Sequence, residues 1–469
     1  MKPDELVDTV VEELDISNIV VEAYPGWGKT KLAAMIADRA ESVAVVTRTH
    51  EEMYELMRFS RGGLIPLFGK EKLCLMWRKG EDVSVYRYCN RLRTLGLCRY
   101  RYTASHELIR WLAGRKPRPE EVAKKAKSLG VCPYPSILTL ASKARKVVTT
   151  YGFAYTYKNV LDKKLVIYDE SHEILNILAG LVERIDDTYI ETLVASLKKK
   201  VETRRLAYFI RACWRKSNSF REFVRLLERA PADVDNEFID SIVSLFYSNK
   251  IYWEGKVGYI LKKPVIKDSG QLFLTAYLPP FFMKAIPNLK MVRIPTDVSL
   301  NVIIDTDVTS RYEERSDETY RLYAEKIEDY YVANTGNLVV FPSYEFMEKV
   351  KQYLSDYILA KVKPPEAIRT IKEGDIVFDV AGGVGTEGVN PSPLLKRVIV
   401  VGLPYPPPTG ELNLLSKLYG FDAVYTYMGL LKVVQAVGRL RFRENADAVL
   451  IDRRYKYVMD YFPPYISVS

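Results

Sequence analysis

The 469-residue sequence contains only three glutamines, three histidines and five cysteines. Three histidines make a His-rich mononuclear metal site a poor interpretation, and an odd number of cysteines argues against a pure disulfide framework. No apolar run approaches the ~20 residues that a membrane-spanning helix needs. The first residues run into an acidic, helix-like stretch without a signal-peptide core. We therefore expect a soluble, cytoplasmic protein without a membrane partner.

The bulk composition is that of an ordinary globular protein, with 48% hydrophobic and 27% charged residues. This composition excludes a disordered tail protein, a collagen-like fibre and a small disulfide-stapled domain. The length suits two or three domains of ~100–200 residues each. Scarce glutamine beside abundant Lys, Arg, Glu and Tyr favours a hyperthermophilic source.

The positive charge of the chain is concentrated in one segment. The formal net charge is +10, and residues 74–132 alone carry fourteen basic and five acidic side chains, a net charge of +9. Aromatic side chains such as Trp77 and Trp111 lie between these charges, an arrangement that suits phosphate neutralisation together with base stacking. A solvated basic face is the alternative interpretation of the same run.

The segment from residue 19 to 37 has the pattern of a phosphate-binding loop. A β-branched run, 19–23, predicts a buried strand, and an apolar helical pattern, 32–37, follows a glycine-rich turn. Gly26 and Gly28 allow backbone N–H groups to close around phosphate oxygens. Lys29 suits the β- and γ-phosphates of ATP, and the hydroxyl of Thr30 suits Mg²⁺. The alternative is a chance Gly-Lys-Thr turn.

A second apolar run, 164–168, predicts a buried strand that ends at two carboxylates, Asp169 and Glu170. In a nucleotide hydrolase, Asp169 would hold Mg²⁺ and Glu170 would accept the proton of the attacking water. The alternative is a strand that leaves its sheet through a polar turn. It is less favoured because the same chain also has the pattern of a phosphate-binding loop.

Four cysteines, Cys74, Cys89, Cys98 and Cys132, lie between these two motifs. Their spacing fits neither a zinc ribbon nor a ferredoxin, and it leaves zinc, an iron–sulfur cluster and buried free cysteines open. Cys213 stands apart from them and is expected in a helix core.

Later segments predict further domains. Residues 175–263 have a mostly helical pattern, as in 178–183 and 220–228. Beyond residue 290, buried strands at 337–341 and 397–401 alternate with helical segments, which indicates a parallel α/β sheet.

The order of these and later motifs resembles that of the XPD-like (XPD/DinG group) iron–sulfur superfamily 2 DNA helicases, and we expect an archaeal member. The resemblance rests on the Asp-Glu-Ser-His sequence at 169–172, which is similar to the family's Asp-Glu-Ala-His box, and on further segments along the chain. These are 43–50 (motif Ia), 341–344 (motif IV), 382–390 (motif V), 402–408, 435–439 (motif VI) and 451–455.

For the nucleotide, the resemblance implies two RecA-like domains that close on ATP and Mg²⁺. It assigns Gln435 to nucleotide sensing and Arg439 to the γ-phosphate, and it adds Glu387 and Gly388 of motif V. The last arginine of motif VI is replaced by Phe442, so that Arg441 and Arg443 both remain candidates. Motif III at 274–278 also departs from the family pattern, as does Asn390 in motif V.

For metal and DNA, the resemblance implies that Cys74, Cys89, Cys98 and Cys132 hold a 4Fe–4S cluster. It also implies that the surrounding basic segment splits the duplex and lines the path of a single strand. The residues expected to contact DNA come from motif Ia and from the basic segment: Arg48, Thr49, Arg87, Arg91, Arg99, Tyr100 and Arg101.

The expected fold class is α/β, with two RecA-like P-loop domains and two insertions in the first. The expected boundaries are helicase domain 1 at 1–70, 139–174 and 264–289, an Fe–S domain at 71–138, a helical Arch domain at 175–263, and helicase domain 2 at 290–469.

The expected function is 5′ to 3′ ATP-dependent unwinding of DNA forks in repair, by a monomer that associates with the nucleoid when active. Two alternatives are a translocase that remodels nucleoprotein with little unwinding and a damage-sensing DNA-binding module.

Overall fold

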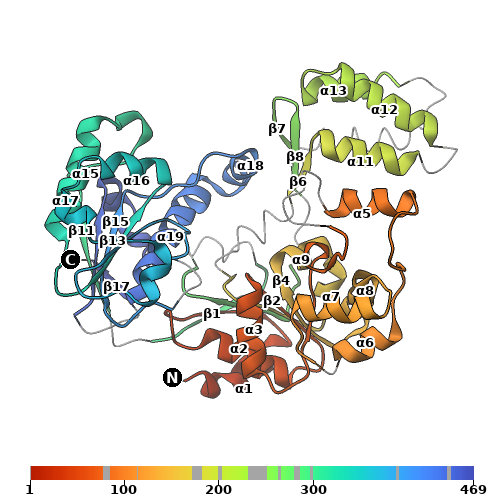
Figure 1. The fold of residues 1–469 in the computed structure, drawn as a ribbon, viewed down its shortest axis with the longest axis horizontal. Helices are drawn as coiled ribbons and strands as arrows, with labels where there is room; N and C mark the ends of the chain where they lie inside the picture. The colour runs from red at the N-terminus through yellow and green to blue at the C-terminus, as the bar shows by residue number, and fades with distance from the viewer. Residues whose placement is uncertain are drawn as a thin grey trace. The chain divides into compact units, whose positions relative to one another are not determined.

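The structure is a computed structural model, shown in Figure 1. It describes residues 2–77, 85–113, 115–171, 182–198, 203–230, 251–261, 266–278, 286–295, 299–386, 390–440 and 445–468. The chain divides into two compact units. The first comprises Met1–Glu173, Val265–Gly402 and Val433–Ser469, and the second comprises Ile174–Pro264 and Leu403–Lys432.

The first unit contains two parallel seven-stranded sheets. The strands of the first sheet follow the order β10-β1-β9-β5-β2-β4-β3. Because β1, β9 and β5 are neighbours and parallel, their carboxyl ends meet at one edge of the sheet. The strands are β1 (Asn18–Glu22), β2 (Val43–Thr47), β3 (Ile65–Pro66), β4 (Lys146–Thr150), β5 (Leu165–Tyr168), β9 (Gln271–Thr275) and β10 (Leu289–Arg293).

Helices connect these parallel strands. Those of the nucleotide-binding fold are α1 (Pro3–Leu14), α2 (Lys29–Arg39), α3 (His50–Phe59), α9 (Tyr151–Thr156) and the 3₁₀ turn η1 (Lys158–Asp162). Between β3 and β4 lie the helices of the cysteine-bearing segment: α4 (Lys70–Leu73), α5 (Val85–Thr94), α6 (His106–Ala113), α7 (Pro119–Ser128) and α8 (Pro133–Lys143).

The second sheet follows the order β13-β14-β12-β15-β16-β11-β17. Its strands are β11 (Leu300–Asp305), β12 (Gly336–Phe341), β13 (Val362–Lys363), β14 (Ile376–Val380), β15 (Leu395–Val401), β16 (Asp447–Ile451) and β17 (Ile466–Val468). β12 is buried along its whole length because helices cover both faces of a parallel sheet.

Helices and 3₁₀ turns alternate with the strands of this second sheet, as they do with those of the first. They are η4 (Tyr312–Glu314), α15 (Asp317–Tyr330), α16 (Tyr344–Lys351), α17 (Asp356–Leu359), η5 (Pro365–Arg369), α19 (Tyr427–Val437), η7 (Gly438–Leu440), η8 (Arg453–Tyr457) and η9 (Met459–Tyr461). The predicted pair of RecA-like parallel sheets is confirmed.

The second unit combines helices with a small antiparallel sheet of order β6-β8-β7. Its elements are β6 (Val182–Ile185), α11 (Asp187–Leu197), α12 (Arg204–Lys216), α13 (Phe220–Leu227), β7 (Ile251–Glu254), β8 (Val257–Leu261), α18 (Gly410–Tyr419) and the π-helical turn η6 (Asp422–Thr426). The mostly helical pattern expected for 175–263 is therefore wrong in part.

Three strands, β6, β7 and β8, account for this correction. Val182 and Glu183, assigned above to a helical pattern, lie in β6, while the rest of that pattern, 178–181, falls outside the described residues. Gly255, at a φ of 56°, allows the tight turn that pairs β7 with β8. In α12, Cys213 is buried in an apolar cluster, as expected. Among the described residues, no helix is long and apolar enough to cross a membrane.

Asn337, a fully buried residue near the start of β12, binds the backbone of the segment that precedes this strand. The side chain of Asn337 accepts a hydrogen bond from the Val332 N–H at 3.1 Å and donates to the carbonyls of Val332 and Thr335, both at 2.9 Å. These bonds satisfy backbone groups that no strand partner reaches.

We expect Asn337→Ala to lower the free energy of unfolding by about 2–3 kcal/mol, because it leaves buried backbone groups without partners. The measurement is thermal or denaturant unfolding. Asn334→Ala, an exposed neighbour of the same residue type, is the control and should change stability by less than about 0.5 kcal/mol. Equal effects of the two substitutions would contradict this role for Asn337.

Candidate active site and cysteine pocket

The turn predicted to bind phosphate follows β1 and ends where α2 begins. Gly26 and Gly28 have φ values of 89° and 111°, in the left-handed region that favours glycine. A Cβ atom at Gly28 would also lie 3.1 Å from Cγ of Pro3, on α1. The backbone N–H groups at the start of α2 therefore face the turn without side-chain interference, as an anion site requires.

Lys29 is the first residue of α2, and its side chain is only 7% exposed. Its Nζ donates to the carbonyls of Ala23 at 2.9 Å and Tyr24 at 3.4 Å, so the amine lies against the turn itself. Burial lowers the pKa of Lys29, and the nearby carboxylates of Glu170 and Asp169 partly oppose that effect.

Asp169 and Thr30 meet at the carboxyl edge of the first sheet. The Thr30 hydroxyl donates to Oδ2 of Asp169 at 3.0 Å, and the Tyr151 hydroxyl donates to the Asp169 carbonyl at 2.9 Å. Burial, together with the charges of Glu170 and Glu52, raises the pKa of Asp169 to about 7, against the opposing effects of Thr30 and Lys29. Thus the two predicted magnesium ligands are brought together.

Glu170 has a φ of 53°, which is uncommon for a residue other than glycine. Its backbone N–H donates to Oδ1 of Asp169 at 3.1 Å. The next residue, Ser171, donates its hydroxyl to the Leu274 carbonyl of β9 at 3.0 Å. The carboxylate motif is thereby joined to the segment predicted as motif III. His172 lies outside the described residues.

The structure gives Arg48 a partner that the sequence interpretation did not include. Its Nε and Nη2 donate to Oε1 of Glu52 at 3.3 and 3.1 Å, and both side chains are only 19% exposed. The backbone N–H groups of Arg48 and Thr49 both donate to Oε2 at 3.0 Å. Thr49 is the N-cap of α3, and Thr49 with Glu52 forms a capping box, the sequence signal that could have identified Glu52.

The loop after β14 was predicted as motif V, but its organising residue, Asp379, was missed. Asp379 is buried and accepts hydrogen bonds from the N–H groups of Val380 at 2.7 Å and Gly385 at 2.6 Å. A Cβ atom at Gly383 would lie 2.0 Å from Oδ1 of Asp379, so this position requires glycine. Glu387 and Gly388 lie outside the described residues.

Motif VI begins on α19 and passes into η7. Gln435 is partly buried on α19. Arg439 lies in η7, and its Nε donates to the Thr386 carbonyl at 2.7 Å, which joins motif VI to the loop of motif V. Arg441 and Arg443 lie outside the described residues, so the choice between them stays a prediction.

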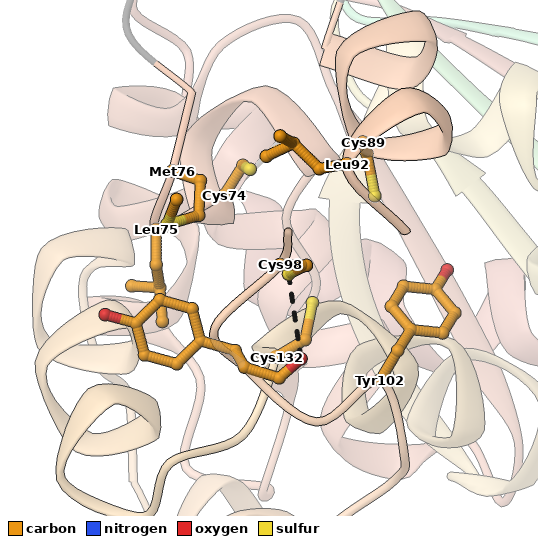
Figure 2. Close-up of a pocket in the computed structure, with 9 residues that line it drawn as sticks. Cys74, Leu75, Met76, Cys89, Leu92, Cys98, Tyr102 and Cys132 are labelled. Carbon is orange, nitrogen blue, oxygen red and sulfur yellow. Dashed lines mark hydrogen bonds between the residues drawn. The ribbon is translucent and has the colours of Figure 1, made fainter. Parts of the chain in front are cut away.

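The four clustered cysteines come from separate segments and line one pocket, as Figure 2 shows. It is also lined by Leu75, Met76, Leu92, Tyr100 and Tyr102.

The thiols are not yet gathered as metal ligands would be. Within the described ranges, no group of three or more His, Cys, Asp or Glu side chains is arranged to hold a metal ion. Burial raises the pKa of Cys132 to about 11, and the nearby Cys89, Cys74 and Cys98 add to this rise. An uncompensated Cys132 thiolate is therefore disfavoured in this pocket, and a bound cation would stabilise it.

The remaining residues expected to contact DNA lie around this pocket. Arg99 and Arg101 are exposed and Tyr100 is partly buried. The Arg101 carbonyl accepts a hydrogen bond from the Cys132 N–H at 2.8 Å, so the basic segment is held against the last cysteine. Arg87 and Arg91 lie on α5, and their side chains are outside the described part.

Comparison with known proteins gives similarity along the whole chain. A family profile described as the helicase C-terminal domain matches residues 327–466. The ATP-dependent DNA helicase XPD of Sulfolobus acidocaldarius is 25% identical over 97% of this chain and 95% of its own length. The ATP-dependent DNA helicase chl-1 of Caenorhabditis elegans is 31% identical over 30% of this chain and 20% of its own length.

Solved structures support the fold. An XPD helicase gives a TM-score of 0.63 at 21% sequence identity and covers 100% of this chain and 99% of its own. Xpd4 of S. tokodaii gives a TM-score of 0.54 at 15% identity, with the same coverage. Together with the sequence similarity, these findings confirm the XPD-like resemblance predicted from the motifs.

We expect the binding of Mg²⁺ with ADP to weaken by up to about tenfold per pH unit below pH ~7, because the metal must displace a proton from Asp169. Calorimetric titration across that pH range measures this. Glu52→Gln removes one of the charges that raise the pKa of Asp169, so its binding should persist to lower pH. If the pH midpoint of Mg²⁺–ADP binding is unchanged or higher in Glu52→Gln, Asp169 is not the group whose proton the metal displaces.

Proposed function

We propose that this XPD-like chain is an ATP-dependent DNA helicase that moves 5′ to 3′ along a single strand and separates duplex DNA. The comparisons support the enzymatic class. The observation that carries the proposal is the hydrogen bond between Thr30 and Asp169, which joins the phosphate-binding turn to the carboxylate motif in a chain similar to XPD over nearly its whole length.

The residues at this edge of the sheet fit the binding and hydrolysis of ATP. Thr30 and Asp169 supply the hydroxyl and carboxylate oxygens that Mg²⁺ prefers, and the metal would supply charge neutralisation at the phosphates. Lys29 exchanges its backbone carbonyls for the β- and γ-phosphate oxygens. Glu170 accepts the proton of the attacking water and orients it.

Residues of the RecA-like fold built on the second seven-stranded sheet complete the proposed site. Arg439 neutralises the charge that develops on the γ-phosphate, and Gln435 senses the nucleotide. The hydrogen bond of Arg439 to the Thr386 carbonyl orients its guanidinium relative to the loop of motif V. Glu387 and Gly388 of that loop, with Arg441 or Arg443, are the remaining proposed nucleotide contacts.

The cysteine pocket suits an iron–sulfur cluster in its donor chemistry. Thiolates are the ligands of such clusters, and four thiols from different segments line one pocket. We assign Cys74, Cys89, Cys98 and Cys132 as the four ligands of a 4Fe–4S cluster. Binding would tie the cysteine-bearing helices together and would release protons, since the ligands must be deprotonated.

The DNA path is proposed from motif Ia and from the cysteine-bearing segment. Arg99, Tyr100 and Arg101 lie beside the cysteine pocket, with Arg87 and Arg91 on α5, and can neutralise phosphates and stack on bases. At motif Ia, Arg48 is paired with Glu52, and Thr49 is the more exposed of the two motif residues. A repair role, action at forks as a monomer, and association with the nucleoid complete the proposal.

A second candidate in the same class is a translocase with little unwinding activity. The observation that favours it is the altered motif III, in which Thr275 bonds locally to the backbone of Tyr277, its hydroxyl lying 2.9 Å from the carbonyl and 3.1 Å from the N–H. A DNA-binding module without hydrolysis is disfavoured by the intact Thr30–Asp169 arrangement.

We expect Lys29→Ala to abolish strand displacement on a 5′-tailed duplex, because the amine that contacts the β- and γ-phosphates is lost. Lys31→Ala is the matched control: it lies two residues further on α2, is exposed and pairs with Asp4, so activity should remain within about twofold. A 3′-tailed duplex tests direction and should not be unwound. If the wild-type protein hydrolyses ATP in response to single-stranded DNA but displaces no strand, the translocase is supported instead.

We expect Cys89→Ser to remove the visible absorption of the purified protein and most of its bound iron, because one of four proposed cluster ligands is lost. Cys213→Ser is the matched control, since Cys213 is equally buried but lies in the apolar core of the second unit. The iron content and absorption of Cys213→Ser should equal those of the wild type. A colourless wild-type protein with stoichiometric zinc would contradict the cluster assignment.

A further inference from the structure

The turn predicted as motif III, at the carboxyl end of β9, receives contacts from several other segments. Thr275, Tyr277 and Leu278 are buried there. Within the turn, the Thr275 hydroxyl donates to the Tyr277 carbonyl at 2.9 Å and accepts from the Tyr277 N–H at 3.1 Å. These two bonds shape the turn locally, and its remaining buried backbone groups need partners from outside it.

One outside partner is Glu22, the last residue of β1, which is only 6% exposed. Its carboxylate accepts a hydrogen bond from the Leu278 N–H, and Nε of Arg293 lies 3.8 Å from Oε1. Burial raises the pKa of Glu22, and Arg293 and the Leu278 N–H oppose that rise. Motif III is thus joined to the strand that leads into the turn predicted to bind phosphate.

A second outside partner, Tyr465, comes from near the end of the chain. It is 5% exposed, and its hydroxyl donates to the Ala276 carbonyl at 2.8 Å. Its backbone belongs to the second seven-stranded sheet, because the Leu300 N–H donates to the Tyr465 carbonyl at 3.0 Å and β17, which follows directly, pairs with β11. This side chain therefore joins motif III of the first RecA-like fold to the edge of the second.

The surroundings of Tyr465 keep its hydroxyl a hydrogen-bond donor. Burial raises the pKa of Tyr465 well above its ordinary value, and the nearby Glu22 and Tyr277 raise it further. A bond in such a buried place is strengthened by the exclusion of water, and removing the donor leaves the Ala276 carbonyl without it. The bond is therefore one that a single oxygen atom controls.

The contacts of motif III continue toward the residues proposed to bind Mg²⁺. Ser171, which follows Asp169 and Glu170, donates to the Leu274 carbonyl at 3.0 Å, two residues before Ala276. The carboxylate motif, the end of β9 and Tyr465 thus form one continuous series of contacts. Such a series can carry energetic coupling if its two ends change together when a ligand binds.

A packing role alone would need the ring of Tyr465 and not its hydroxyl. Other tyrosines of the second RecA-like fold bond within that fold, as Tyr331 does to the Gly374 carbonyl at 3.0 Å. The Tyr465 hydroxyl instead bonds to the first fold, and it does so at the segment, 274–278, that departs from the family pattern of motif III. A contact made outside the motif therefore accompanies the altered sequence within it.

We infer that Tyr465 is a positioning residue that ties motif III to the second RecA-like fold, so that nucleotide binding at the first sheet is transmitted to the second. The inference rests on the proposed function, because it needs Mg²⁺ and a nucleotide at the edge formed by Thr30 and Asp169. It gives a role in coupling to a residue that none of the motifs described above includes.

The test is amide hydrogen exchange of the full chain with and without Mg²⁺–ADP, followed by mass spectrometry. In the wild type, Mg²⁺–ADP should slow exchange at residues 24–32, at 274–278 and at 465–468. Tyr465→Phe keeps the ring and removes the hydroxyl. It should keep the protection at 24–32 and reduce that at 465–468 by roughly 3- to 10-fold, the effect of one hydrogen bond.

Tyr331→Phe is the matched control, because it removes a hydroxyl that donates to a backbone carbonyl within the second fold. Its protection by Mg²⁺–ADP should equal that of the wild type. Strand displacement gives a second readout: Tyr465→Phe should consume roughly 3- to 10-fold more ATP for each strand displaced, with the KM for ATP within about twofold of the wild type. Tyr331→Phe should consume the same amount as the wild type.

Protection at 465–468 that persists in Tyr465→Phe would overturn the inference. Protection at 24–32 without protection at 465–468 in the wild type would also overturn it and would leave the proposed function intact. A wild type protected at none of these segments would contradict nucleotide binding, and the inference with it. Because the exchange measurement needs no DNA, a protein that fails to unwind duplex can still support or overturn the role of Tyr465.

Discussion

The hydrogen bond from the Thr30 hydroxyl to Asp169 is the contact on which the proposed chemistry depends. It joins residues that lie far apart in the chain, and it forms because β1, β9 and β5 are parallel neighbours whose carboxyl ends share one edge. Lys29 lies beside Thr30 at the start of α2, and Glu170 and Ser171 directly follow Asp169. Ser171 extends the connection to β9 through the Leu274 carbonyl. A change at this edge therefore affects Lys29, the two carboxylates and the adjacent strand β9 together.

Carboxylates and cations lie close together at this carboxyl edge of the first sheet. Asp169, Glu170 and Glu52 repel one another, and Lys29 and Arg48 are the cations that oppose them. Burial strengthens each of these interactions because water is excluded. The buried carboxylates repel one another without a ligand, and the proposed binding of a divalent cation with phosphates would relieve that repulsion.

Much of the fold could be predicted because local signals were strong. The strands around Val20, Ile167 and Val339 have apolar centres rich in valine and isoleucine, and glycines mark the turn predicted to bind phosphate. The partners of side chains could not be predicted, since they depend on tertiary contacts. Nothing in the apolar pattern around residue 379 indicates that Asp379 would fold back to bind the loop after it. Likewise, the antiparallel β7–β8 pair was hidden in a segment whose average pattern is helical.

Asp379 has a further consequence for the energetics of ligand binding. By accepting hydrogen bonds from the Val380 and Gly385 N–H groups, it fixes the first part of the motif V loop from within, in a space that only glycine at position 383 permits. A loop that is already ordered loses little conformational entropy when a ligand arrives. A ligand that binds to this first part of the loop would therefore meet a preorganised backbone.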